Sequence, residues 1–164
     1  MQSLMPTAER VAGLLKARKE TIAVAESSAG GLIAAALLAV PGASAYFLGG
    51  AVVYTRQSRG ALAGITDAEM KGLRSSSEPY AQLLARTQRH RHGATWGLAE
   101  TGAAGPSGNS YGDAAGHSCI AVAGPMERVL TLETGHGDRA VNMRAFGLKA
   151  LETMLTVLEA QPKA

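Results

Sequence analysis

Residues 21–38 (TIAVAESSAGGLIAAALL) contain the feature that most constrains the fold of this chain. The segment 21–25 is almost wholly apolar and does not alternate, which predicts a strand buried on both of its faces. Such a strand needs a covering layer on each side of its sheet. The run of small apolar residues from Gly30 to Val40 predicts a helix that Pro41 and Gly42 stop. A strand, a polar turn and a helix are therefore expected in direct succession.

Further helices and strands are expected along the rest of the chain. Helices are expected at 7–18, 66–73, 77–92 and 138–158, and further strands at 46–54, 95–101, 117–124 and 127–134. The last two strands are expected to form a hairpin across Pro125 and Met126. This order predicts an α/β domain with helices covering a mixed sheet, and 164 residues suit one domain spanning 1–164.

Composition excludes several classes of protein. The chain is 46% hydrophobic and 18% charged, which is typical of a soluble globular protein. One cysteine, Cys119, excludes an intramolecular disulfide framework and a zinc site built from several cysteines. No apolar run reaches the roughly 18 residues of a membrane span, and the N-terminal residues do not resemble a secretory signal. We therefore expect a cytoplasmic protein without a membrane partner.

The net charge of +3 raises the question of nucleic acid. The basic residues are scattered, and the densest cluster, which lies in the segment 86–92 (RTQRHRH), is interpreted as the solvated end of a helix. We expect no nucleic-acid partner. A modest positive balance also suits a small anionic substrate.

Three polar segments follow three of the expected strands. They are Glu26-Ser27-Ser28, Tyr54-Thr55 and the glycine-rich loop 102–116, which is too long to be a plain connection. Ligands of α/β sheets bind at the carboxyl ends of the strands, where such segments meet. The sequence therefore predicts a pocket at this edge, without yet defining its chemistry.

The turn AESSAGG has two interpretations. A helix beginning near Ala29 offers free backbone N–H groups, and Gly30 and Gly31 would let an oxyanion approach them, so that Ser27 or Ser28 can act as a nucleophile. Alternatively, Ser28 only caps the helix. The turn matches neither GxSxG nor SxxK.

The loop 102–116 matches neither GxGxxG nor the Walker A pattern, so it is a phosphate cradle, a substrate lid or a plain surface loop. His117 and His136 border loops and can reach a ligand. His90 and His92 lie on different faces of a helix, so no metal site is expected.

Together these segments resemble a known family. The stretch 25–54 (AESSAGGLIAAALLAVPGASAYFLGGAVVY) is similar to the AESCTGG…VPGAS…F..G.V.Y signature of the CinA C-terminal domain family. The similarity continues in SSSEP (75–79), in TGAAGPSG (101–108) and in GDR (137–139). The motifs cover nearly the whole chain in the order and spacing of that family.

The resemblance implies a fold, an activity and a site. The fold would be a three-layer α/β/α domain with a mixed, mostly parallel sheet. The activity would be hydrolysis of the carboxamide of nicotinamide mononucleotide to nicotinic acid mononucleotide and ammonia, with Ser27 and Tyr54 as catalytic residues and no metal or organic cofactor. The partner would be a small nucleotide substrate, and a homodimer or higher homo-oligomer is expected. The residues expected around the substrate are Glu26, Ser28, Gly30, Gly31, Thr101, Gly102, Ala104, Gly105, Pro106, Gly108, His117 and Arg139.

One position departs from the family. Its members carry a lysine five residues after the tyrosine, where this chain has Arg59. Arginine does not give up its proton as a buried lysine can. Three hypotheses stay open: Arg59 assists Tyr54 or holds the substrate phosphate, another base such as Glu26 or His117 replaces the lysine, or the domain binds a nucleotide without cleaving it. An amidase for another small carboxamide is a further alternative.

In the leading hypothesis Ser27 attacks the carboxamide, and the N–H groups of Gly30 and Gly31 hold the oxyanion. Tyr54, tuned by Arg59, moves the proton to the leaving ammonia. The phosphate would be bound by Arg139 or by the backbone of residues 102–108.

Overall fold

Five strands form one sheet in the order β2-β1-β3-β4-β5 in the computed structural model, which describes residues 1–161. Their bounds are β1 Ile22–Glu26, β2 Phe47–Val52, β3 Trp96–Ala103, β4 His117–Ala123 and β5 Arg128–Glu133. β1 runs parallel to β2 and to β3, whereas β4 is antiparallel to both of its neighbours, so four strands point one way and one the other. The sheet is mixed, as expected.

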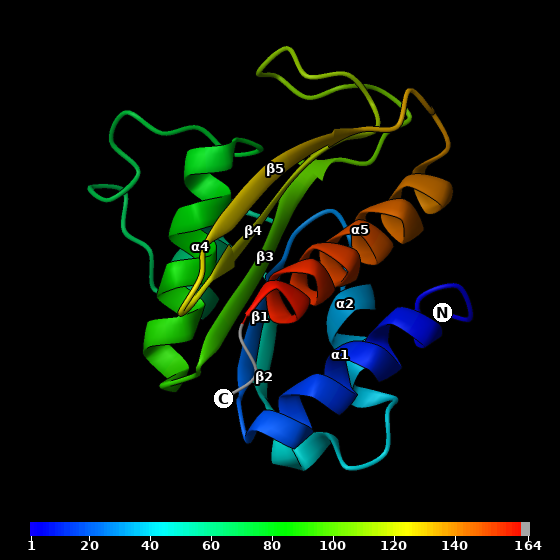
Figure 1. Cartoon of the computed structure of the whole chain (residues 1–164). Coiled ribbons are helices and arrows are strands. Elements are labelled where there is room, and N and C mark those ends of the chain that lie inside the picture. The colour runs from blue at the N-terminus through cyan, green and yellow to red at the C-terminus, as the bar shows by residue number, and fades with distance from the viewer. Residues whose placement is uncertain (162–164) are drawn as a thin grey trace.

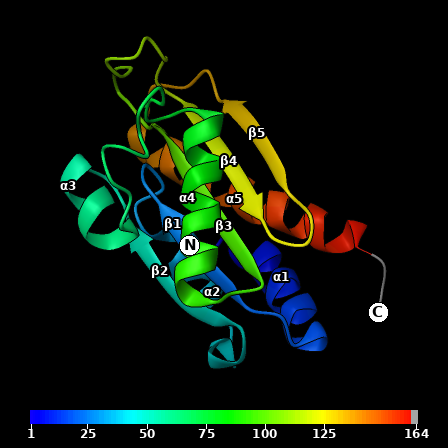
Figure 2. The same ribbon diagram turned by 90° about the vertical axis from the view of Figure 1, so that its left-hand side faces the viewer.

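Helices cover both faces of this sheet (Figure 1). The long ones are α1 Met5–Arg18, α4 Glu78–His92 and α5 Arg139–Ala160, and the short ones are α2 Leu32–Leu38, α3 Arg56–Ser58, the 3₁₀ turn η1 Ala43–Ala45 and the π-helical turn η2 Arg59–Ala63. α4 lies on one face, while α1, α2 and α5 lie on the other (Figures 1 and 2). The protein is therefore the three-layer α/β/α domain that its sequence predicts.

The central strand explains this arrangement. Every residue of β1 is buried, because successive side chains point to opposite faces of the sheet and each face carries its own apolar cluster. Val24 packs with the α1, α2 and α5 layer, and Ala25 packs with the α4 layer. The non-alternating segment 21–25 thus has the two-sided burial that its composition predicts.

Helix signals in the sequence are confirmed at α4 and fail at residues 66–73. The Ser77 hydroxyl caps α4 by accepting a hydrogen bond from the Tyr80 N–H, with Pro79 in the first turn. Thr66 and Glu69 also form their expected capping box, but only turns follow it. Only Met70 is buried in that segment, so no apolar face stabilises a helix there.

The segment after β2 contains helical structure that the sequence analysis did not predict. Thr55 and Ser58 form a reciprocal capping box that begins α3, and the chain continues directly into η2. These two turns set the positions of Arg56 and Arg59. Within residues 1–161, no helix has the length and apolarity needed to cross a membrane.

Candidate active site

The carboxyl ends of β1, β2 and β3 meet at one edge of the sheet, because these strands are parallel and in register there. Glu26 pairs with Val52 of β2, and Ala25 pairs with Ala99 of β3. A cleft of about 390 Å³ opens at this edge. Its walls are Ser27, Val53, Tyr54, Thr55, Arg56, Arg59, Ser75, Ser76, Tyr80, Thr101, Gly102, Asn109 and Tyr111.

A second hollow of about 190 Å³ adjoins the cleft and shares Tyr54, Gly102 and Asn109 with it. Its other walls are Ser28, Ala103, Ala104, Gly105, Ser107, Gly108 and Arg139. All three segments that the sequence predicts for this edge therefore line one continuous site. The structure places Glu26, Gly30, Gly31, Pro106 and His117 outside the walls of both hollows.

Glu26 organises the turn between β1 and α2. Its carboxylate accepts hydrogen bonds from the N–H groups of Gly31 (2.9 Å), Ile33 (3.1 Å) and Ala34 (2.6 Å). The side chain is only 1% exposed, and this burial raises the pKa of Glu26 against the opposing effect of the three donors. Glu26 therefore serves as the cap of α2 and takes no part as a free base.

These contacts correct the expected role of the two glycines. The Gly31 N–H is taken by Glu26, and the Gly30 N–H donates to the Ser27 carbonyl at 3.1 Å. Neither group is free to bind an oxyanion. Both glycines have positive φ, +67° and +98°, so they are needed for the shape of the turn and not for an anion cradle.

Glu100 supports the same turn from β3. Its carboxylate accepts hydrogen bonds from the Ser27 N–H (3.1 Å), the Ala29 N–H (2.8 Å) and the Ser118 hydroxyl (3.0 Å). The side chain is 0% exposed. Burial, opposed by these three hydrogen bonds, raises the pKa of Glu100 to about 7. The role of Glu100 is not predicted from the sequence, although a carboxylate inside a buried strand is a signal for one.

The two serines of the turn differ in their contacts. Ser27 is half-buried, and its hydroxyl makes no hydrogen bond with any residue of the described chain, 1–161. Ser28 is 4% exposed, and its hydroxyl donates to the Gly102 carbonyl at 2.6 Å. The hydroxyl of Ser28 ties the turn to β3, whereas that of Ser27 is available to a ligand in the cleft.

Tyr54 lies just beyond the end of β2 and is 58% exposed. Its phenolic oxygen accepts a hydrogen bond from Arg139 Nη2 at 3.0 Å, and Arg139 Nη1 donates to the Gly105 carbonyl at 2.7 Å. The phenol O–H is thereby left free to donate elsewhere. Arg139, the first residue of α5, joins the end of β2 to the long loop. It is this arginine, and not Arg59, that contacts the phenol.

Arg59 begins η2 and is one of the residues that line the cleft. It is 9% exposed, and its Nη2 donates to Asp67 Oδ1 at 2.6 Å. The Arg59 Nε is buried and has no hydrogen-bond partner among the described residues. Asp67 also accepts two hydrogen bonds from Arg56, through Nε and Nη2.

The glycine-rich loop contributes backbone atoms to the site. A Cβ on Gly102 would lie 2.3 Å from the His117 carbonyl oxygen, so only glycine allows β3 and β4 to approach here. The Gly102 carbonyl accepts hydrogen bonds from the hydroxyls of Ser28 and Ser76. The Ala104 carbonyl accepts from Asn142 of α5.

The tip of this loop is fastened to the segment before α4. Arg74 donates two hydrogen bonds to Asp113, at 2.7 and 3.0 Å, and its Cζ lies 5.5 Å from the ring centre of Tyr111. Because Tyr111, Ser75 and Ser76 all line the cleft, this contact joins two of its walls.

His117 fastens a strand and is not directed into the cleft. Nδ1 lies 2.5 Å from Glu133 Oε1, and Nε2 lies 2.9 Å from the Ser76 carbonyl oxygen. Burial lowers the pKa of His117, but these hydrogen bonds and the nearby Asp113 outweigh it and leave the pKa raised. Two acceptors suit an imidazolium with both N–H groups occupied, which does not serve as a base.

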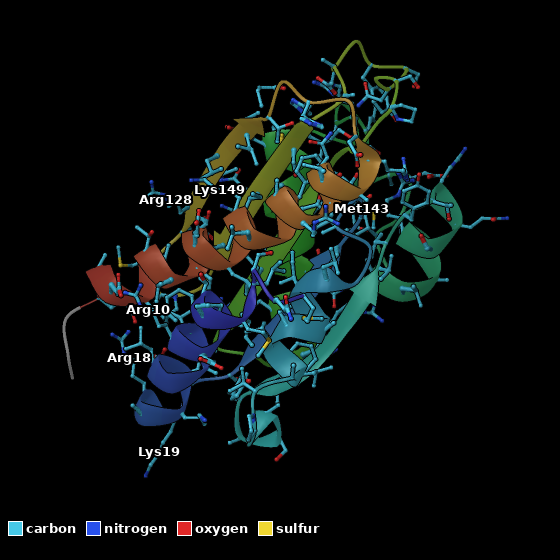
Figure 3. All side chains as sticks on the ribbon, turned by 90° about the vertical axis from the view of Figure 1, so that its right-hand side faces the viewer. Arg10, Arg18, Lys19, Arg128, Met143 and Lys149 are labelled. Atoms are coloured by element: carbon cyan, nitrogen blue, oxygen red, sulfur yellow. The ribbon has the colours of Figure 1, made fainter. Side chains whose placement is uncertain are left out.

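The surface also has hollows outside this candidate site. A hollow of about 350 Å³ between α1, β5 and α5 includes Arg10, Arg128 and Lys149 (Figure 3). Arg10 is paired there with Glu159, and Lys149 with Glu152. Within residues 1–161, no group of three or more His, Cys, Asp and Glu side chains is arranged to hold a metal ion.

Comparison with known proteins identifies the family. The sequence profile described as "CinA C-terminal domain" matches residues 4–158. The chain belongs to this family. A CinA-like protein of Desulfosudis oleivorans is 40% identical over 149 residues, which cover 88% of this chain and 35% of the relative. A CinA-like protein of Chlorobaculum tepidum is 37% identical over 156 residues, covering 92% of this chain and 37% of the relative.

Solved structures of this CinA superfamily show the same fold. The competence damage-inducible protein A (ComA) of Klebsiella pneumoniae superposes with a TM-score of 0.89 at 24% identity, over 97% of this chain and 99% of that one. The competence/damage inducible protein CihA of Agrobacterium tumefaciens superposes with a TM-score of 0.86 at 28% identity, over 95% of each chain. The chain spans about a third of the length of the CinA-like proteins and nearly all of these two structures.

Proposed function

We propose that this CinA-family protein hydrolyses the carboxamide of nicotinamide mononucleotide, giving nicotinic acid mononucleotide and ammonia. The observation that carries the proposal is the meeting of an unbonded serine hydroxyl, Ser27, and a phenol, Tyr54, in one cleft at the carboxyl ends of β1 and β2. The cleft volume of about 390 Å³ falls within the range of small-ligand sites.

The first half of the reaction is acyl transfer to serine. The Ser27 Oγ attacks the carboxamide carbon, and Tyr54 accepts the serine proton while it donates its own proton to the leaving nitrogen. The C–N bond breaks, ammonia leaves, and an ester joins the substrate carbonyl to Ser27. Because Arg139 donates to the phenol oxygen, the phenol proton is directed away from Arg139 and is available for this relay.

The second half is hydrolysis of that ester by water. Tyr54 carries the proton from the attacking water to the departing Ser27 oxygen, which restores the enzyme and releases the carboxylic acid. The Ser28 N–H has no hydrogen-bond partner within residues 1–161, in contrast to those of Gly30 and Gly31. It is the candidate donor to the oxyanion in both halves, a role typically worth about 3 kcal/mol.

Ammonia release from nicotinamide mononucleotide tests this function. We expect Ser27→Ala to lower kcat by about 10³-fold or more. Tyr54→Phe should lower it by about 10²- to 10⁴-fold, because the phenol proton is lost. Ser44→Ala, at an exposed position in η1, is the matched control and should leave kcat unchanged. Wild-type protein that releases no ammonia at any pH from 5 to 9 would contradict the proposal.

One observation favours a second candidate, a nucleotide-binding module without turnover. No lysine lines either hollow within the described chain, and Arg59 is held by Asp67 where the family carries a lysine. Calorimetry with nicotinamide mononucleotide separates the two functions. Saturable binding without ammonia release selects the silent module, and turnover of another carboxamide in a substrate panel selects an amidase of different specificity.

A further inference from the structure

The cleft has a charge pattern that the proposed reaction does not use. The residues that line it include two arginines and eight hydroxyl-bearing side chains. No Asp or Glu is among the residues that line it. The reaction at Ser27 and Tyr54 needs neither of these arginines, Arg56 and Arg59. A cleft with cationic and hydroxyl donors and no carboxylate on its walls favours an anionic ligand.

Arg59 is the buried member of this pattern. Burial of a guanidinium carries a large desolvation cost unless hydrogen bonds and opposite charge offset it. Its Nη2 has Asp67, but its Nε has no partner within residues 1–161, although the side chain is nine-tenths buried. Nη1 makes no hydrogen bond within residues 1–161 and, unlike Nε, is not fully buried, so it is the group of Arg59 that an acceptor can reach.

Within residues 1–161, the only carboxylate paired with Arg59 is that of Asp67, which is also paired with Arg56. Asp67 accepts two hydrogen bonds from Arg56 and one from Arg59, so two positive groups face one negative group. Asp67 itself is 62% exposed, which weakens the compensation it gives to Arg59. The three side chains together carry one net positive charge, which an anionic ligand would neutralise.

The local fold fixes the positions of Arg56 and Arg59. Thr55 and Ser58 cap each other at the start of α3, and the backbone then turns through η2. Arg56 and Arg59 are three residues apart, so both reach Asp67 from adjacent turns. The phenol of Tyr80 and the hydroxyl of Ser75 line the same cleft as neutral donors, whereas the Ser76 hydroxyl donates to the Gly102 carbonyl.

Three other cations that line hollows already have hydrogen-bond or ion-pair partners. The Arg139 guanidinium donates two of its five N–H groups, one to Tyr54 and one to the Gly105 carbonyl. In the hollow beside α5, Arg10 is paired with Glu159 and Lys149 with Glu152. Within residues 1–161 Arg59 makes one hydrogen bond and Arg139 makes two, so Arg59 has more N–H groups left for an anion.

We propose that Arg59, assisted by Arg56, forms a binding site for the phosphate monoester of the ligand in this cleft. A guanidinium matches phosphate because its planar N–H groups can donate to two oxygens at once. Arg59 stands where the family carries a lysine. In this proposal it binds the substrate and does not transfer a proton. The identity of the anion as the phosphate of a pyridine nucleotide rests on the proposed function, whereas the anion site itself does not.

Calorimetry with three probes tests this site: inorganic phosphate, nicotinic acid mononucleotide and its phosphate-free nucleoside. We expect Arg59→Met to weaken binding of the mononucleotide by about 10- to 100-fold, since a hydrogen bond to a charged group is lost. Binding of the nucleoside should change by less than about 2-fold. Arg86→Met is the matched control, because Arg86 is paired with Glu127 outside the cleft.

Two further variants protect the test against misfolding. Arg59→Lys keeps the positive charge and should recover part of the phosphate affinity. It should not recover all of it, because lysine lacks the bidentate hydrogen bonds of a guanidinium. Asp67→Asn removes the shared carboxylate at an exposed position and should tighten binding of inorganic phosphate. Unchanged phosphate and mononucleotide affinity in both Arg59→Met and Asp67→Asn would overturn the proposal, as would loss of affinity confined to Arg139→Met.

The outcome is distinguishable from that of the amidase assay. Binding of nicotinic acid mononucleotide needs no turnover, so Arg59-dependent affinity in a protein that releases no ammonia supports the phosphate site and contradicts only the proposed reaction. Ammonia release with a KM that Arg59→Met does not raise overturns the phosphate site and supports only the reaction.

Discussion

At the scale of single residues, Glu100 illustrates how a buried carboxylate sets the geometry of the candidate nucleophile. Two of its hydrogen bonds come from the N–H groups of Ser27 and Ala29, on either side of Ser28. The third comes from Ser118 on the neighbouring strand. The position of the Ser27 backbone is therefore determined by a side chain that does not line the cleft.

The raised pKa of Glu100 has a consequence for stability. The folded protein keeps a proton on Glu100 up to about pH 7, whereas the unfolded chain releases it near the ordinary value of 4.5. The folded state is therefore destabilised progressively as the pH rises from about 4.5 to about 7 and no further above that. The full cost is on the order of 3 kcal/mol, from 1.36 kcal/mol for each pKa unit.

We expect Glu100→Gln to remove this pH dependence. The amide oxygen can accept both N–H groups of the turn, and the amide nitrogen can donate to Ser118, so the contacts are kept without a charge. The variant should be more stable than the wild type by about 1–3 kcal/mol at pH 8 and nearly equal to it at pH 5. Urea unfolding at both pH values measures this difference.

Ser118→Ala is the control for Glu100→Gln. It removes one hydrogen bond to the carboxylate but leaves the ionisable group in place, so the slope of stability against pH should remain. Stability curves of Glu100→Gln and the wild type that run parallel from pH 5 to pH 8 would show that Glu100 is ionised throughout this range.

At the scale of elements, the sequence predicts the strands and long helices well because their signals are local. The non-alternating segment 21–25 and the Ser77 cap of α4 need no knowledge of the rest of the chain. The turns at residues 66–73 and 56–63 are predicted wrongly or missed, because a short helix depends on burial against other elements. Both segments contain a capping box, but a capping box alone does not determine whether a helix follows.

The sequence likewise predicts some features of the candidate site and not others. The sequence places Ser27, Tyr54 and the loop 102–116 together, because parallel strands bring their ends to one edge. It does not predict that Glu26 takes the N–H group of Gly31, or that Arg139 and not Arg59 reaches Tyr54. Those partners are chosen by side-chain directions and by contacts between residues far apart in the chain.

The loop between β3 and β4 contributes residues to both hollows of the candidate site. Its tip is held by the two hydrogen bonds from Arg74 to Asp113, and these hydrogen bonds lower the pKa of Asp113. We expect Asp113→Asn to free the tip, so that backbone amides of residues 105–114 exchange with solvent at least several-fold faster. Hydrogen–deuterium exchange with mass spectrometry measures this directly.

Kinetics should report the same change. If the loop holds the substrate in place, Asp113→Asn should raise KM several-fold and change kcat little, and the difference from the wild type should shrink in high salt. Glu127→Gln is the matched control, since Glu127 also accepts two hydrogen bonds from one arginine, Arg86, on a surface outside the cleft. Equal exchange rates in both variants would mean that the ion pair does not hold the loop.

At the scale of the whole molecule, the two apolar clusters belong to one cooperative unit. They lie on opposite faces of the same sheet, and adjacent residues of β1 contribute to each, Val24 to one and Ala25 to the other. Neither face can lose its helices without exposing strands that the other face needs. The chain should therefore unfold in a single transition, as small single domains do.

Two matched truncations, one on each face, test this unity. Leu84 of α4 and Leu151 of α5 are both 0% exposed, and each change to alanine should cost about 2–5 kcal/mol. Trp96 is fully buried and belongs to the α5 side, whereas circular dichroism reports all helices. If the molecule is one unit, Leu84→Ala should shift the Trp96 fluorescence transition and the dichroism transition together, although Leu84 lies on the far face. A fluorescence midpoint unmoved by Leu84→Ala would instead show that α4 detaches separately, and the site between α4 and the long loop would then open without unfolding of the core.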